Sequence, residues 1–129
     1  MVMFDTDMVI ALAKGNVGAR ETYVVYAGKE RIIVSSITWY ELMMGCCNRG
    51  SNAHLRKIVE CLGEAGIMHI DDTVATFAAR TAAQLSKKGR PIGTADMFIA
   101  ASCVVNGQTL VTRNTKHFLG IPGLKVEAW

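Results

Sequence analysis

Short apolar runs alternate along the chain with segments in which apolar residues recur at helical spacing. The short runs are rich in Val and Ile and end at polar residues or turn residues, a pattern that favours buried strands. Strands are therefore predicted at Val2 to Phe4, Arg31 to Ser35, Gly66 to Ile70, Thr109 to Thr112 and Leu124 to Glu127.

The segments between these runs are predicted to be helices. The clearest is His54 to Glu64, where Leu55, Ile58, Val59 and Leu62 follow the i, i+3, i+4, i+7 spacing of a helix with one apolar face. The segment Cys47 to Ala53 is predicted to be a loop. Further helices are predicted at Asp7 to Ala13, Val17 to Ala27, Ser36 to Gly45, Asp72 to Lys87 and Asp96 to Asn106.

Strands that alternate with helices indicate an α/β fold, in which a mostly parallel sheet of about five strands is covered on both faces. In such sheets, ligands bind beyond the C-terminal ends of the strands, where the connections switch direction. Asp5 and Asn114 follow strand ends directly, and Glu41 and Asp96 lie in early turns of helices on the same side. These four groups are expected to converge on one rim.

Convergence of these side chains would indicate a metal site. Carboxylates about 5 Å apart repel each other by about 3 kcal/mol per pair at an effective dielectric constant of 20, so a cluster needs protons or cations. Oxygen ligands without Cys or His suit Mg²⁺ or Mn²⁺, and such ions support hydrolysis of phosphodiesters. Asp5 is the hardest to explain otherwise, because a carboxylate at the end of a buried strand is costly without a partner.

Each of the other acids also has a purely structural interpretation. Asp96 lies in the first turn of a helix that Thr94 can cap, where the helix dipole favours negative charge. The run from Thr38 to Glu41 fits a capping box, and Asp7 can cap the first helix. At Asp96 the two interpretations are compatible, because a helix start that stabilises a carboxylate also aims it at the rim.

Composition and charge bound the remaining possibilities. A length of 129 residues, 50% hydrophobic and 19% charged, is typical of one globular domain spanning residues 1–129. No apolar run approaches the roughly 18 residues of a membrane helix, and the N-terminus has no basic region, so a cytoplasmic location is expected. The net charge of +3 permits a polyanionic partner.

Cysteine and basic residues add little to the predicted site. The four cysteines form no CxxC pair and are expected to be reduced thiols, and a metal site built on His54 and Cys61 lacks further ligands. Trp39 and Tyr40 fit either base stacking or packing in the core or a dimer contact. Five basic residues are candidates for phosphate contacts or for ordinary solvated surface: Lys87, Lys88, Arg90, Arg113 and Lys116.

The ordered motifs resemble those of the PIN-domain ribonucleases, specifically the VapC-type toxins of toxin–antitoxin pairs. The resemblance runs along nearly the whole chain. It is carried by Phe4-Asp5-Thr6-Asp7, by Ser35-Ser36-Ile37-Thr38 leading to Glu41, by Arg90-Pro91-Ile92-Gly93 leading to Asp96, and by Leu110 to Phe118 followed by Ile121-Pro122-Gly123.

This resemblance implies a PIN-like α/β/α sandwich and an Mg²⁺- or Mn²⁺-dependent endoribonuclease that acts on RNA, with transfer and ribosomal RNA among the expected substrates. It also implies a homodimer and a cognate antitoxin protein, and no membrane partner. By position, Asp5, Glu41 and Asp96 are the metal-site residues, Glu41 directly or through water. Asn114 takes a fourth position that is Asp in many relatives, and acts with Thr6 through hydrogen bonds or water.

Two other functions remain open at this stage. Asp5-Thr6-Asp7 after a strand also fits an aspartate-nucleophile phosphatase, although that function gives Glu41 and Asp96 no role. Asn114 in place of an acid also fits a non-catalytic module that binds RNA or a protein partner.

Overall fold

A computed structural model describes residues 1–129 and shows five strands in one sheet. The strands are β1 (Val2–Phe4), β2 (Ile32–Ser35), β3 (Gly66–Met68), β4 (Thr109–Val111) and β5 (Lys125–Glu127). Their order across the sheet is β3-β2-β1-β4-β5, and every neighbouring pair is parallel. The predicted α/β class with a parallel sheet of about five strands is confirmed.

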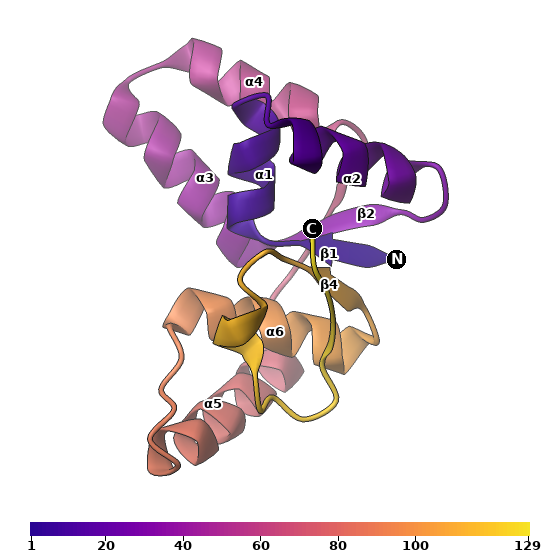
Figure 1. Cartoon of the computed structure of the whole chain (residues 1–129). Helices are drawn as coiled ribbons and strands as arrows, with labels where there is room; N and C mark the ends of the chain where they lie inside the picture. The colour runs from indigo at the N-terminus through magenta and orange to yellow at the C-terminus, as the bar shows by residue number, and fades with distance from the viewer.

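Six α-helices and one short 3-10 helix connect the strands. They are α1 (Thr6–Ala13), α2 (Val17–Ala27), α3 (Ser36–Arg49), α4 (Asn52–Leu62), α5 (Asp72–Lys87), α6 (Thr94–Asn106) and η1 (Thr115–Phe118). In Figure 1, α1 to α4 lie on one side of the sheet and α5 and α6 on the other. The molecule is therefore an α/β/α sandwich. None of its helices is long and apolar enough to cross a membrane.

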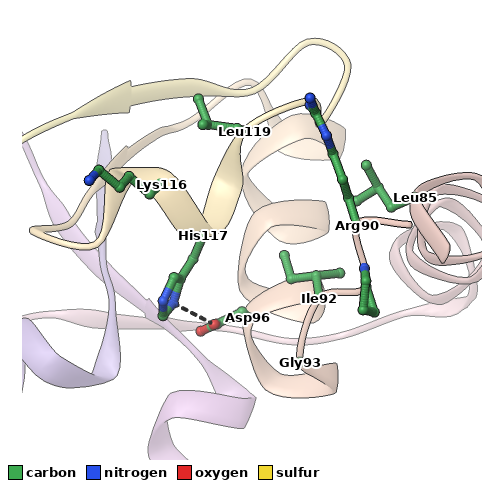
Figure 2. A pocket seen from close by; sticks show the side chains of 9 residues that line it. Leu85, Arg90, Ile92, Gly93, Asp96, Lys116, His117 and Leu119 are labelled. Atoms are coloured by element: carbon green, nitrogen blue, oxygen red, sulfur yellow. Dashed lines mark ion pairs between the residues drawn. The ribbon is translucent and has the colours of Figure 1, made fainter. Parts of the chain in front are cut away.

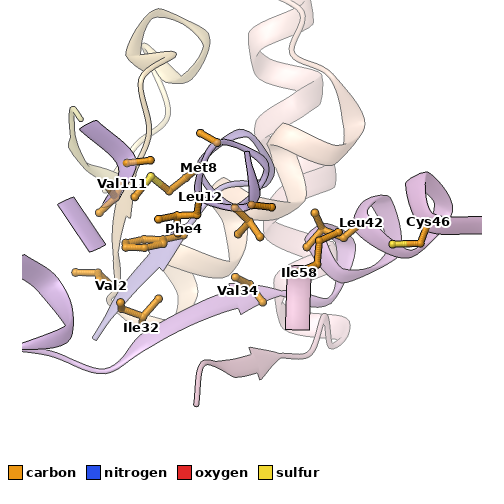
Figure 3. Packing of buried hydrophobic residues seen from close by; sticks show 14 residues of the cluster. Val2, Phe4, Met8, Leu12, Ile32, Val34, Leu42, Cys46, Ile58 and Val111 are labelled. Atoms are coloured by element: carbon orange, nitrogen blue, oxygen red, sulfur yellow. The ribbon is translucent and has the colours of Figure 1, made fainter. Parts of the chain in front are cut away.

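The alternation of side chains along each strand divides the core into two clusters. Val2 and Phe4 of β1 face α1 to α4, whereas Met3 between them faces α5 and α6. Figure 3 shows the first cluster, in which Phe4 lies beside Met8 and Leu12 of α1. Since neighbouring residues of a strand point to opposite faces, the wholly apolar β1 fits the centre of the sheet, where both of its faces are buried.

Aromatic contacts fix the end of β1. The ring of Phe4 makes edge contacts with Tyr23 and Tyr26 of α2, with ring centroids 6.4 and 6.1 Å apart. Such pairs contribute about 0.5–1.5 kcal/mol each beyond the burial of their apolar surface. The residue that follows Phe4 is Asp5, so this packing holds the backbone of the first predicted site residue in place.

The side of the sheet to which the chain adds strands changes at β1, in the centre of the sheet. From β1 the chain adds β2 and then β3 on one side, and later returns to add β4 and β5 on the other side. The C-terminal ends of β1 and β4 therefore flank the crevice at which α/β proteins of this type bind ligands. Asp5 follows β1, and Thr112 to Asn114 follow β4.

Several local predictions are wrong in detail. Asp5, not Asp7, caps α1: its backbone is extended, and its side chain accepts a hydrogen bond from the Met8 N–H. The capping box at Glu41 is absent, because Ser35 caps α3. Thr94 does not cap α6 either; the cap is Gly93, without a side-chain hydrogen bond.

Several element boundaries also differ from the prediction. The loop predicted over Cys47 to Ala53 is mostly helical, because α3 continues to Arg49 and α4 begins at Asn52. Gly50, at φ 60°, takes the left-handed conformation that ends a helix within one residue. The third strand is shorter than predicted and ends at Met68.

Candidate active site

The four residues predicted from the sequence line one cleft of about 330 Å³ beyond the C-terminal ends of β1 and β4. Asp5 and Asn114 come from these strand ends, and Glu41 and Asp96 come from α3 and α6. The other residues that line the cleft are Thr6, Asp7, Ile10, Met44 and His117. The lining thus contains no Lys or Arg and four carboxylates, those of Asp5, Asp7, Glu41 and Asp96.

Asp5 is tied to both neighbouring elements. Its Oδ1 accepts a hydrogen bond from the Met8 N–H at 2.8 Å, and its Oδ2 accepts one from the Thr112 hydroxyl at 2.5 Å. The Asp5 residue is only 5% exposed and Thr112 is fully buried. Because Thr112 directly follows β4, this hydrogen bond joins the ends of the two strands that flank the crevice.

Burial raises the pKa of the Asp5 carboxyl above its usual range. The hydrogen bonds from Thr112 and Met8 oppose this shift by favouring the charged form, whereas the nearby charges of Asp7 and Asp96 reinforce it. The two hydrogen bonds thus compensate the buried charge of Asp5 only in part. A bound cation would supply the missing compensation.

Glu41 is positioned by α1 rather than by the start of its own helix. Its Oε2 accepts a hydrogen bond from the Thr6 hydroxyl at 2.5 Å, and this hydroxyl also lies 3.2 Å from the buried hydroxyl of Thr38. This hydrogen bond joins the first residue of α1 to α3 and so holds Glu41 at the cleft that Asp5, the cap of α1, also lines.

Asp96 lies in the first turn of α6, as predicted, and faces His117 of η1. Figure 2 shows the two side chains pointing toward each other, with His117 Nδ1 3.5 Å from Asp96 Oδ2. The Asp96 side chain is 39% exposed and that of His117 is 61% exposed. Their contact is therefore well solvated, and exposed pairs of this kind contribute little to stability.

Asn114 acts as a hydrogen-bond donor at the fourth position. Its side-chain amide donates to Asp7 Oδ2 at 2.8 Å, and its backbone N–H donates to the Thr112 hydroxyl oxygen at 3.1 Å. The amide thus keeps the Asp7 carboxylate at the edge of the cleft, where Asp7 adds a fourth negative charge.

Two residues of the site were missed from the sequence, His117 and Thr112. Both lie within the run Leu110 to Phe118 that carries the family resemblance, so this run was a signal for both. Their partners could not be predicted from it, because the contact of Thr112 with Asp5 depends on β4 lying beside β1, and that of His117 with Asp96 depends on η1 lying beside the start of α6.

The remaining candidates lie outside the cleft. Arg90 and Lys116 line an adjoining pocket, and the guanidinium of Arg113 lies 5.1 Å from the centre of the Trp129 ring. The four cysteines are free thiols. No three His, Cys, Asp or Glu side chains of the chain, those of the cleft included, lie close enough together to hold a metal ion in their present positions. His54 and Cys61 therefore belong to no such group.

Comparison with known proteins identifies the family. The profile of the PIN domain matches residues 2–123. A tRNA(fMet)-specific endonuclease VapC from Shigella flexneri is 30% identical over 129 residues, which cover 98% of this chain and 96% of that protein.

Solved structures agree with the sequence matches. VapBC2 from Rickettsia felis, bound to a DNA fragment from its promoter, superposes with a TM-score of 0.88 at 27% identity, covering 100% of this chain and 99% of that one. DNA-bound VapBC from Salmonella typhimurium gives a TM-score of 0.82 at 30% identity, with the same coverage. This chain therefore belongs to the PIN-domain family and, within it, to the VapC ribonucleases.

Proposed function

We propose that this protein is an endoribonuclease that hydrolyses RNA phosphodiester bonds in the cleft lined by Asp5, Glu41 and Asp96. The observation that carries the proposal is the convergence of four carboxylates in a cleft without Lys or Arg, in a member of the VapC ribonucleases. The phosphatase alternative gives Glu41 and Asp96 no role, so their presence in the same cleft favours the nuclease.

The donor chemistry of the cleft fits Mg²⁺ or Mn²⁺, which prefer oxygen ligands. Asp5 and Asp96 would bind the ion directly, and Glu41 directly or through water. A bound ion would polarise the phosphoryl group, lower the pKa of the attacking water and stabilise the leaving oxygen. Because the Asp96 contact with His117 is long and solvated, Asp96 can exchange this partner for a cation at little cost.

The other residues of the cleft orient these carboxylates. Thr112 and the Met8 N–H fix Asp5 with one hydrogen bond to each oxygen. The Thr6 hydroxyl occupies Oε2 of Glu41 and leaves Oε1 available to accept a hydrogen bond from the attacking water. Asn114 holds Asp7 at the edge of the cleft and so adds negative charge without contacting the reacting atoms.

The proposed partners follow from the relatives. The VapBC structures from Rickettsia felis and Salmonella typhimurium support a cognate antitoxin that inhibits this chain. The name of the Shigella flexneri relative supports transfer RNA as the first substrate to test. A homodimer remains a proposal that rests on the family resemblance.

Incubation of the purified protein with transfer RNA tests the proposal. We expect cleavage with Mg²⁺ or Mn²⁺ and none with EDTA. Asp96→Asn removes one charge with little change of shape, and its cleavage rate should fall by about a hundredfold or more. The matched control is Asp72→Asn, because Asp72 is an exposed acid in the first turn of α5, outside the cleft.

Two results would contradict the proposal. One is equal cleavage by Asp96→Asn and the wild type. The other is RNA binding without cleavage under either divalent ion, which would instead support a non-catalytic binding module.

A further inference from the structure

A second pocket adjoins the carboxylate cleft and shares two residues with it, Asp96 and His117. Its volume is about 550 Å³, and it lies between the connection from α5 to α6 and the short helix η1. The volume is within the range of about 300–1,000 Å³ that is typical of small-ligand sites. Any molecule that occupies this pocket therefore lies directly beside the proposed reaction centre.

The charge of this pocket is opposite to that of the cleft. Arg90 and Lys116 line it, and neither takes part in an ion pair; the two ion pairs of the chain are Met1 with Glu30 and His117 with Asp96. Nη1 of Arg90 lies 3.7 Å from the place that a Cβ on Gly120 would take, so the Arg90 side chain spans the pocket toward the loop after η1. Two cations without partners favour an anionic occupant.

Part of the wall of this pocket is apolar, although Asp96 and His117 also line the pocket. Ile92 and Leu119 form this apolar part, and Leu119 is 63% exposed although it is a large apolar side chain. Figure 2 shows Arg90 and Lys116 on either side of Leu119 and Ile92. An apolar surface between two separated cations matches one nucleotide of a strand, because its base is apolar on its faces and a phosphate flanks it on each side.

We propose that this pocket is a nucleotide subsite, which takes one unstacked nucleotide of the substrate RNA next to the phosphodiester that is cleaved. Arg90 and Lys116 bind its flanking phosphates, and Ile92 and Leu119 contact its base. The inference rests on the proposed ribonuclease function. The pocket requires this nucleotide to be unstacked, because a base within a duplex is stacked and cannot enter a pocket.

Binding of a short fluorescein-labelled single-stranded RNA, measured by anisotropy in EDTA, tests the phosphate contacts without cleavage. The double variant Arg90→Gln with Lys116→Gln should bind about tenfold more weakly. The slope of log affinity against log salt concentration should fall by about 1.4, because two phosphate contacts are lost. Arg90 and Lys116 are both exposed, so their exchange for glutamine should preserve the fold.

The matched control is Lys29→Gln with Lys125→Gln. These lysines are also exposed, and they lie at the opposite, N-terminal edge of the sheet, before β2 and at the start of β5. The control changes the net charge by the same amount and should weaken binding by less than about twofold. Equal weakening by the two double variants would mean that only overall charge matters, and would overturn the proposal.

A second arm tests the base contact. Leu119→Ala should weaken binding of the single strand by about threefold to tenfold and leave the affinity for a duplex of the same sequence unchanged. The control is Val59→Ala, which removes an apolar side chain of α4 that is 49% exposed and should change neither affinity. Equal weakening of single-strand and duplex binding by Leu119→Ala would contradict an unstacked base in the pocket.

The outcomes separate this inference from the function on which it rests. Normal cleavage by the wild type, together with unchanged RNA affinity of the Arg90/Lys116 variant, would overturn the subsite and leave the ribonuclease in place. Loss of affinity for the antitoxin but not for RNA would assign the pocket to a protein interface, and would also overturn it. Pocket-dependent RNA binding without metal-dependent cleavage would support the subsite while contradicting the proposed function.

Discussion

Asp5 has a structural and a proposed chemical task at the same position. Its two oxygens cap α1 and accept the hydrogen bond from Thr112, and the same carboxylate is the central candidate ligand of the cleft. The first task needs only a hydrogen-bond acceptor, whereas the second needs a negative charge. Substitution by an amide of the same shape separates the two.

We predict that Asp5→Asn stabilises the metal-free protein at neutral pH. Burial raises the Asp5 pKa above its ordinary value of 3.8, so the folded state binds the proton more tightly than the unfolded state does. The contribution of Asp5 to the free energy of unfolding is therefore greatest below pH 3.8 and decreases as pH rises through its folded-state pKa. Asparagine avoids this cost because it keeps a carbonyl oxygen for Met8 and offers an amide to Thr112.

Urea unfolding in EDTA at several pH values measures this difference. The wild type should lose stability relative to Asp5→Asn as pH rises from 3.8, and the difference should level off above the folded-state pKa of Asp5. A variant that is less stable than the wild type at neutral pH would contradict an incompletely compensated charge at this position.

At the residue scale, the sequence was sufficient to bring the four predicted side chains to one cleft, because each follows a strand end or lies in an early turn of a helix. It was not sufficient to choose between Asp5 and Asp7 as the cap of α1. Both can cap a helix, and the choice depends on which backbone is extended. Thr112 was missed because its partner is 107 residues away. The chemical roles of the four residues stay predictions.

At the element scale, the two helices that carry Glu41 and Asp96 depend differently on glycine. Gly107 ends α6 at φ 65°, a conformation that other residues adopt at a cost, whereas Gly45 lies inside α3 with ordinary helical backbone. A Cβ would meet nothing within 4 Å at either position. Backbone conformation alone therefore determines the effect of alanine.

We predict opposite effects of the two alanine substitutions on stability. Gly107→Ala should lower the free energy of unfolding by about 1 kcal/mol because of the left-handed backbone. Gly45→Ala should raise it by about 0.5–1 kcal/mol, because alanine loses less conformational freedom in a helix. Urea unfolding of both variants measures the difference, and a change of the same sign in both would contradict these backbone assignments.

Helix existence was predictable from apolar spacing, but some helix boundaries were not. The segment after Gly45 contains two cysteines, an asparagine and an arginine, and has no apolar periodicity. It is nevertheless helical to Arg49, because α3 packs against α4 and continues until Gly50 allows the turn. Tertiary packing thus extends a helix where local propensity is neutral.

At the scale of the whole molecule, strand order determines the site. The sequence predicts parallel strands from their alternation with helices, but their order depends on which apolar faces pack together. The wholly buried β1 takes the centre, and the chain then grows outward on both sides of it. This order puts Thr112 beside Asp5 and opens the crevice to which α3 and α6 bring Glu41 and Asp96.

The central claim is that Asp5 and Asp96, 91 residues apart in the sequence, serve one metal-dependent catalytic site. Single-turnover cleavage of transfer RNA with Mn²⁺ tests it most directly when Asp5→Asn, Asp96→Asn and the double variant are compared. Residues that act as a unit have non-additive effects. Each single variant should lose about a hundredfold or more in rate, and the double variant should be no slower than the slower single variant. Losses that multiply in the double variant, or a wild-type rate in Asp96→Asn, would contradict the claim.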